Sequence, residues 1–69
     1  MNIRNKRIRR EELENKCVKE YTRRHKKINQ EVLRKLGDYI DNSVSFDQDG
    51  RTKNGVNIEN LLDEFEKTL

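Results

Sequence analysis

Residues 10–40 read REELENKCVKEYTRRHKKINQEVLRKLGDYI, and this stretch decides the fold. Its apolar side chains recur at spacings of four, four, seven, four, four and three: Leu13, Cys17, Tyr21, Ile28, Val32, Leu36 and Tyr39. At roughly 100° per residue, these positions share one helix face about 140° wide. The pattern therefore predicts one long amphipathic helix over residues 9–42, with an apolar stripe ~45 Å long at 1.5 Å per residue.

A break near Asn29 is the alternative to a continuous helix. An asparagine side chain can cap the start of a second helix, with Ile28 and Leu33 as its hydrophobic staple. Helix–turn–helix geometry would then be possible. However, the apolar stripe keeps its phase across Asn29, and no Gly or Pro marks a turn there. We therefore favour a continuous helix that ends near Asn42 and tolerates Gly37 in its interior.

Residues 43–57 change character and predict a loop. Val44 and Phe46 alternate with serines, and two turn signals follow at residues 47–50 and 54–55. A small β-hairpin could pair these two apolar residues with Val56 and Ile58. Two such strands alone are marginally stable in water.

The last segment predicts a short amphipathic helix over residues 58–68. Asn57 is a suitable N-cap, and apolar residues follow at helical spacing: Ile58, Leu61, Leu62, Phe65 and Leu69. We expect this helix to pack back on the long helix. The alternative is a docking helix that enters a groove of another protein.

The chain is small, so a core built from it alone would be only marginally stable. It has 69 residues, of which 30% are hydrophobic, and its single cysteine excludes an internal disulfide. The C-terminal helix spans only ~18 Å and cannot cover a stripe of about 45 Å. We therefore expect an all-α homodimer of single-domain chains. The predicted interface residues are Leu13, Cys17, Tyr21 and Ile28.

Charge is segregated along the chain. Residues 1–36 carry 13 Lys/Arg against 5 Asp/Glu, whereas residues 37–69 carry 3 against 8. This layout is typical of a protein that binds nucleic acid or an acidic protein surface. No apolar run approaches a membrane span and the N-terminus lacks a signal-peptide core, so we expect a cytoplasmic protein without a membrane partner. The Asn- and Lys-rich, proline-free composition suits a low-GC bacterium or its phages.

Two groups of basic residues are the candidate nucleic-acid contacts. Residues 1–8 predict a mobile basic arm, and a basic rail ~27 Å long follows on the helix face opposite the apolar stripe. Their structural alternatives are a frayed terminus and an ordinary solvated face. Both tyrosines lie on the apolar side, so contacts to phosphate are expected rather than base stacking. The candidates are Arg4, Arg7, Arg9, Arg10, Lys16, Lys19, Arg23, Lys26, Lys27 and Arg34.

The residues that could carry catalysis or bind metal do not form a recognisable set. Cys17 and His25 would lie roughly 12 Å apart along a helix, and a zinc site needs three or four such ligands. Asp47 and Asp49 are spaced as in an EF-hand loop, but its twelfth position is Val56 where a bidentate Glu is required. No phosphate loop or catalytic triad is evident. We expect no enzyme activity, no metal and no cofactor.

Two functions follow from these patterns. The first is a small nucleic-acid-binding or transcription-associated protein that contacts phosphates through its basic arm and helix face. The alternative is a phage-type protein-interaction module, an inhibitor or scaffold. It would act through the apolar stripe or the acidic C-terminal helix.

Overall fold

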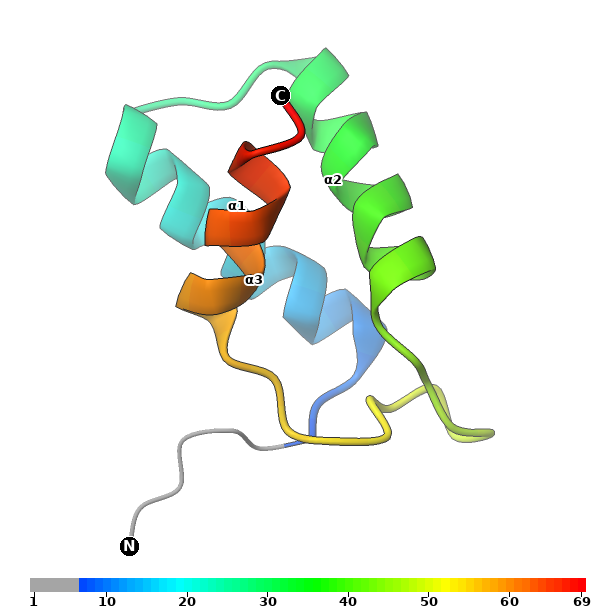
Figure 1. Cartoon of the computed structure of the whole chain (residues 1–69). Helices are drawn as coiled ribbons and strands as arrows, with labels where there is room; N and C mark the ends of the chain where they lie inside the picture. The colour runs from blue at the N-terminus through cyan, green and yellow to red at the C-terminus, as the bar shows by residue number, and fades with distance from the viewer. Residues whose placement is uncertain (1–6) are drawn as a thin grey trace, which may run out of the picture.

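Three helices make up the fold of the part that the computed structural model describes, residues 7–69 (Figure 1). Helix α1 spans Arg10–His25, α2 spans Gln30–Ser43 and α3 spans Ile58–Glu66. A short connection joins α1 to α2 at one end of the molecule, and α3 packs on α1 (Figure 1). Residues 44–57 run along the opposite end, beside the start of α1 (Figure 1). The predicted all-α class is confirmed.

The predicted continuous helix over residues 9–42 is wrong. α1 ends at His25, because Lys26 adopts a left-handed conformation with φ of 72° and its N–H donates to the Thr22 carbonyl at 2.6 Å. α2 then begins behind Asn29, whose side chain accepts a hydrogen bond from the Val32 N–H at 2.9 Å. The Asn29 cap is thus formed as in the alternative interpretation.

Burial explains why the chain breaks there. The break lets the two halves of the apolar stripe face each other, so that Leu13 and Cys17 share one core with Leu36 and Ile40, and all four are fully buried. Each buried large aliphatic side chain contributes about 1.5–3 kcal/mol. A left-handed residue with a side chain costs about 1–2 kcal/mol. Folding the stripe on itself therefore outweighs the strain at Lys26.

The same core overturns the premise of the predicted dimer interface. Leu13 and Cys17 have no exposed surface, and Tyr21 is 9% exposed. Ile28 packs, half-buried, against this core. The prediction held that the C-terminal helix is too short to cover the stripe and that a second protomer covers the rest, whereas α2 of the same chain folds back over it. The homodimer stays a prediction, but these residues no longer support it.

The described end of the predicted mobile arm is held on the fold. Ile8 is only 8% exposed and belongs to the core. Its N–H donates to the Thr52 hydroxyl at 3.1 Å, and the Thr52 N–H donates back to the Ile8 carbonyl at 2.8 Å. At residues 7 and 8 the mobile-arm prediction is therefore wrong, and residues 1–6 lie outside the described part.

The possible hairpin does not form, although residues 44–57 are ordered by pairing. The Asp47 carboxylate accepts hydrogen bonds from the N–H groups of Asp49 and Arg51, which closes a turn earlier than the hairpin requires. Phe46 consequently pairs with Thr52 in an isolated bridge, and the residues beyond it lead into α3. Residues 7–69 contain no β-strand, only this bridge and a second one between Arg9 and Arg51.

The predicted C-terminal helix is confirmed, with its end at Glu66 instead of residue 68. The Asn57 side chain caps it by accepting from the Asn60 N–H at 3.0 Å. Leu62 and Phe65 are buried, and the Phe65 ring lies 5.4 Å from the Tyr39 ring. α3 therefore packs back on the chain as expected. No helix within residues 7–69 is long and apolar enough to cross a membrane.

Truncating the central aromatic residue should nearly unfold the domain. Phe65 is 1% exposed, so Phe65→Ala removes a fully buried ring and leaves a cavity, at a cost of about 3–5 kcal/mol. Leu69→Ala is the matched control, because Leu69 is 52% exposed and should change stability by less than about 0.5 kcal/mol. Urea unfolding followed by circular dichroism measures both. Equal, small losses would show that α3 is not part of the core.

Removing the side chain at the break should stabilise the fold. Glycine adopts positive φ without strain, so Lys26→Gly relieves about 1–2 kcal/mol, partly offset by the greater freedom of glycine in the unfolded chain. We expect a net gain of about 0.5–1 kcal/mol and a melting temperature several degrees higher. Lys27→Gly, in the same connection but without positive φ, should not stabilise. A lower melting temperature for Lys26→Gly would mean that residue 26 is helical in solution.

Candidate nucleic-acid interface

The exposed face of α1 keeps part of the predicted basic rail. Lys16, Lys19 and Arg23 lie on it at spacings of three and four, opposite the buried stripe, and all three are exposed. Lys16 has only a distant ion pair, 3.9 Å to Glu12. Arg23 donates to both oxygens of Glu20, at 3.0 and 2.6 Å. Lys19 has no ion pair with any residue of the described chain.

The rest of the predicted rail is not in line with this face. Lys26 and Lys27 lie in the connection after α1, where the left-handed turn ends the helical phase. Arg34 lies on the exposed side of α2, beside Gln30 and Glu31. The predicted straight rail of about 27 Å assumed an unbroken helix at 1.5 Å per residue, and it is therefore wrong.

Arg10 serves a structural purpose. Its guanidinium reaches α2, where Nε donates to Asp41 at 2.6 Å and Nη2 donates to the Gly37 carbonyl at 3.3 Å. Within α1, Nη1 donates to Glu14 at 2.9 Å. The hydrogen bond from Arg10 lowers the pKa of Asp41, and the same bond raises the pKa of Arg10. Arg10 thus cross-links α1 to α2 and has little left to offer a ligand.

Arg7 is also held by its own chain. Its Nε donates to the Thr52 carbonyl at 2.8 Å, and Nη2 forms an ion pair with the Asp47 carboxylate. Its side chain nevertheless remains 52% exposed. Arg4, another candidate, lies outside the described residues.

Arg9 is exposed, and the fold places a further arginine beside it. Arg51 pairs with Arg9 in an antiparallel bridge, and both side chains line a shallow concavity of about 220 Å³ together with Arg7, Ile8 and Glu12. Sequence reasoning missed Arg51 because it belongs to the acidic half of the chain. Only the return of residues 50–52 to the start of α1 brings it there.

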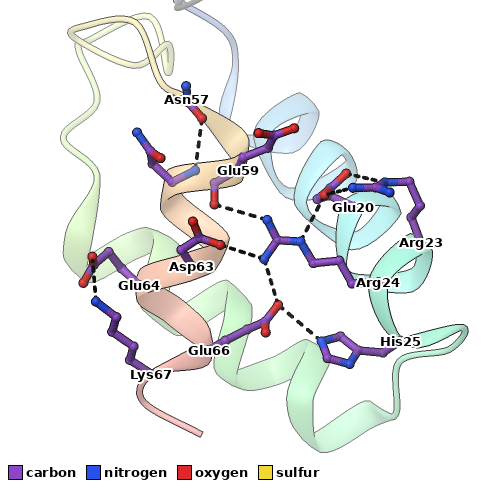
Figure 2. Close-up of polar contacts among 11 residues, drawn as sticks. Glu20, Arg23, Arg24, His25, Asn57, Glu59, Asp63, Glu64, Glu66 and Lys67 are labelled. Carbon is purple, nitrogen blue, oxygen red and sulfur yellow. Dashed lines mark hydrogen bonds and ion pairs between the residues drawn. The ribbon is translucent and has the colours of Figure 1, made fainter.

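The most connected charged residue, Arg24, was not predicted as a site residue. Figure 2 shows its guanidinium between α1 and α3. Nε donates to Glu20 at 3.0 Å, Nη1 lies 3.0 Å from Asp63 and 3.1 Å from Glu66, and Nη2 donates to the Glu59 carbonyl at 3.5 Å. These contacts tie the acidic face of α3 to α1.

His25 extends this group of contacts. Its Nε2 lies 3.3 Å from the Glu66 carboxylate (Figure 2). The centroid of its ring lies 4.3 Å from that of Tyr21, and the two ring planes are tilted by 37°. The contact with Glu66 is an ion pair only when the imidazole is protonated. The Arg24 contacts therefore form a structural junction between α1 and α3. Each carboxylate in this junction, on Glu20, Asp63 and Glu66, is already paired with a cation of the same chain.

Hydrogen bonds donated by two arginines keep the Glu20 carboxylate ionised. Donation from Arg23, and then from Arg24, lowers the pKa of Glu20 to about 2. The same bond to Glu20 raises the pKa of Arg24. Both groups are therefore charged throughout the neutral range. These ion pairs lie in the last two turns of α1, next to the exposed Lys19.

The remaining reactive groups are dispersed. Residues 7–69 hold no group of three or more His, Cys, Asp or Glu side chains that could bind a metal ion. Burial raises the pKa of the Cys17 thiol to about 11, so it is protonated at neutral pH. An open concavity of about 450 Å³ between the end of α2, residues 54–57 and α3 has Glu64 as its single ionisable lining residue. None of these places assembles catalytic groups.

Comparison of the chain with protein-family models, with curated proteins and with solved structures finds no match.

The depressed pKa of Glu20 predicts acid sensitivity with a defined sign. The unfolded carboxyl titrates near 4.3, so its stabilising contribution is complete above about pH 5 and is lost as the pH falls towards about 2. Urea unfolding at pH 7, 4, 3 and 2.5 should show a shallower loss of stability for Glu20→Gln than for the wild type. Glu31→Gln, in an exposed pair with Lys35, should follow the wild type. Parallel curves for all three proteins would contradict the prediction.

Proposed function

We propose that the protein is a non-enzymatic nucleic-acid-binding protein that contacts backbone phosphates through one basic strip. The strip consists of Arg9, Lys16, Lys19, Arg23 and Arg51. Its members are neighbours: Arg9 and Arg51 share a concavity with Glu12, Glu12 lies one helical turn before Lys16, and Lys19 and Arg23 follow on the same face of α1.

The observation that carries the proposal is how the chain distributes its arginines. Arg10 and Arg24 each make several internal ion pairs and hydrogen bonds that hold helices together. Within the described residues, Arg9, Lys19 and Arg51 make no ion pair, and all three are exposed. The two arginines that join helices are thus different residues from these three solvent-facing cations. Exposed cations that make no ion pair within residues 7–69 also lie outside α1: Lys26, Lys27, Arg34 and Lys53. The strip is the group of cations that lies along α1 and at its start.

The dimensions of the strip suit a phosphate backbone. From Arg9 to Arg23 it extends ~21 Å at 1.5 Å per residue, and duplex DNA carries one charge about every 1.7 Å of its axis. Its five cations are accompanied by the carboxylates of Glu12 and Glu20. Several phosphate contacts along one groove edge are therefore compatible with its length and charge.

The aromatic residues support phosphate contacts over base contacts. Tyr21 and Phe65 are buried, and Tyr39 and Phe46 pack against the core. No aromatic side chain lies on the strip to stack on a base. Amide side chains that could read adenine are few on this face of α1, where Asn15 lies exposed one turn before Lys19. The protein should accordingly bind with weak sequence preference.

We favour this function over the protein-interaction module. That alternative depended on an open apolar stripe or on a free acidic helix. The stripe is buried by the chain itself, and Asp63 and Glu66 of α3 already pair with Arg24. An acidic protein surface could meet the same basic strip, and the measurement below separates it from nucleic acid.

Reversing charge on the strip should abolish binding to a duplex. The test variant is Arg9→Glu with Lys19→Glu, which spares Arg23 and its bonds to Glu20. In fluorescence-anisotropy titrations with a short mixed-sequence duplex, wild-type affinity should fall steeply between about 50 and 200 mM salt. Removing two contacts by neutral substitution, Arg9→Gln with Lys19→Gln, should reduce the log–log slope by about two.

A charge-matched control tests whether position matters as well as net charge. Arg34→Glu with Lys35→Glu makes the same change in charge on the exposed side of α2, away from the strip. This control should retain most of the binding. Equal losses in both double mutants, or no wild-type binding at about 50 mM salt, would reject the proposal and leave an acidic protein as the partner to test.

A further inference from the structure

Two arginines face each other directly at the start of α1. The bridge between Arg9 and Arg51 is antiparallel, and it is flanked by hydrogen bonds from Thr52 N–H to the Ile8 carbonyl at 2.8 Å and from Arg10 N–H to the Gly50 carbonyl at 3.1 Å. Because the hydrogen bonds lie on either side, Arg9 and Arg51 form a non-hydrogen-bonded pair. In such a pair the Cα atoms are only about 4.5 Å apart and the side chains are close.

The two guanidinium groups project to the same side. Their neighbours Ile8 and Thr52 are buried, at 8% and 0% exposure. Successive side chains of extended backbone point to opposite faces, so Arg9 and Arg51 both point to solvent. Both are exposed, and both line the same concavity of about 220 Å³.

Like charges directly opposite each other in an antiparallel pair destabilise the fold. By contrast, Arg10 and Arg24, which lie between helices, are each paired with a carboxylate. Within residues 7–69, Arg9 and Arg51 have none within ion-pair distance. Glu12 lines the concavity as well, but its ion pair is with Lys16, on the next turn of α1.

A third arginine is fixed beside this pair. Arg7 also lines the concavity, and its guanidinium is oriented by the Thr52 carbonyl and the Asp47 carboxylate. The positive end of the α1 dipole adds to the same field, since Arg9 is the N-cap residue and makes no side-chain cap. Arg7 is paired with Asp47, and the first turn of α1 carries Glu11 and Glu12. Arg9 and Arg51 are therefore the two cations of this concavity that make no ion pair within residues 7–69.

We propose that Arg9 and Arg51 clamp a single phosphate group, with Arg7 as a supporting charge. A phosphate oxyanion between two guanidinium groups accepts charge-assisted, often bidentate, hydrogen bonds from each and converts their repulsion into attraction. The clamp rests on the proposed function, because it would be the anchoring position of the nucleic-acid backbone on the strip. It adds a defined phosphate site to a surface that otherwise attracts phosphates without fixing them.

The clamp predicts that Arg51→Gln changes the melting temperature differently in chloride and in phosphate. Thermal unfolding is followed in sodium chloride and in sodium phosphate of equal ionic strength and pH. Wild-type folding should be favoured about tenfold at a phosphate concentration near ten times its dissociation constant, which raises the melting temperature. Arg51→Gln should melt at the same or a higher temperature in chloride, because the repulsion is removed, and should lose the response to phosphate.

Two further variants sharpen the measurement. Arg34→Gln removes one exposed arginine from α2 and should respond to phosphate like the wild type. Glu12→Gln removes the carboxylate from the concavity and should strengthen the response. Pyrophosphate in place of phosphate should act on the same variants, since it presents the same oxyanion.

The outcomes separate the clamp from the proposed function. If phosphate stabilises wild type and Arg51→Gln equally, or stabilises neither, the clamp is rejected even when the duplex still binds. If phosphate stabilises only proteins with both arginines while no duplex binds, the clamp stands and its phosphate belongs to a small molecule. Loss of phosphate response and of duplex affinity in Arg51→Gln together would support both.

Discussion

The fold depends on one constraint: a short chain with one long apolar stripe must cover that stripe by itself. The left-handed residue Lys26 and the Asn29 cap turn the stripe back on itself, and the Leu62–Phe65 face of α3 closes the remaining side. Each part of this arrangement needs the others. Without the break, Leu13 and Cys17 would lose Leu36 and Ile40 of α2 as core neighbours. Without α3, the Tyr21 and Tyr39 rings would lose their contacts with the Phe65 ring.

Charge then divides into two roles that follow from this packing. Where helices meet, arginines bridge them: Arg10 joins α1 to α2, and Arg24 joins α1 to α3. These contacts neutralise much of the acidic half against the basic half. A smaller set of cations lies on the exposed face of α1. They are neighbours because the apolar side chains of α1 occupy the opposite, buried face. The basic strip therefore consists of cations that do not join two helices, and two of them, Lys16 and Arg23, pair with carboxylates of α1 itself.

The loop of residues 44–57 contributes more than a connection. The turn at Asp47 brings residues 50–52 against the start of α1, buries Thr52 and sets Arg51 opposite Arg9. One backbone pairing thus holds Ile8 on the core and sets two exposed arginines, Arg9 and Arg51, opposite each other. Structural and functional consequences share the same few hydrogen bonds, so the loop is as much a part of the candidate site as α1 is.

Four features could be predicted from local periodicity and composition: the all-α class, the C-terminal helix with its Asn57 cap, the identity of most core residues and the basic character of residues 10–25. Tertiary structure decided the break at residue 26, since a stripe that stays in phase is equally compatible with a straight helix and with a folded one. It also decided which arginines are consumed internally and that Arg51 joins Arg9. The roles of these arginines depend on contacts between residues about 30 to 45 positions apart, which local sequence patterns cannot predict.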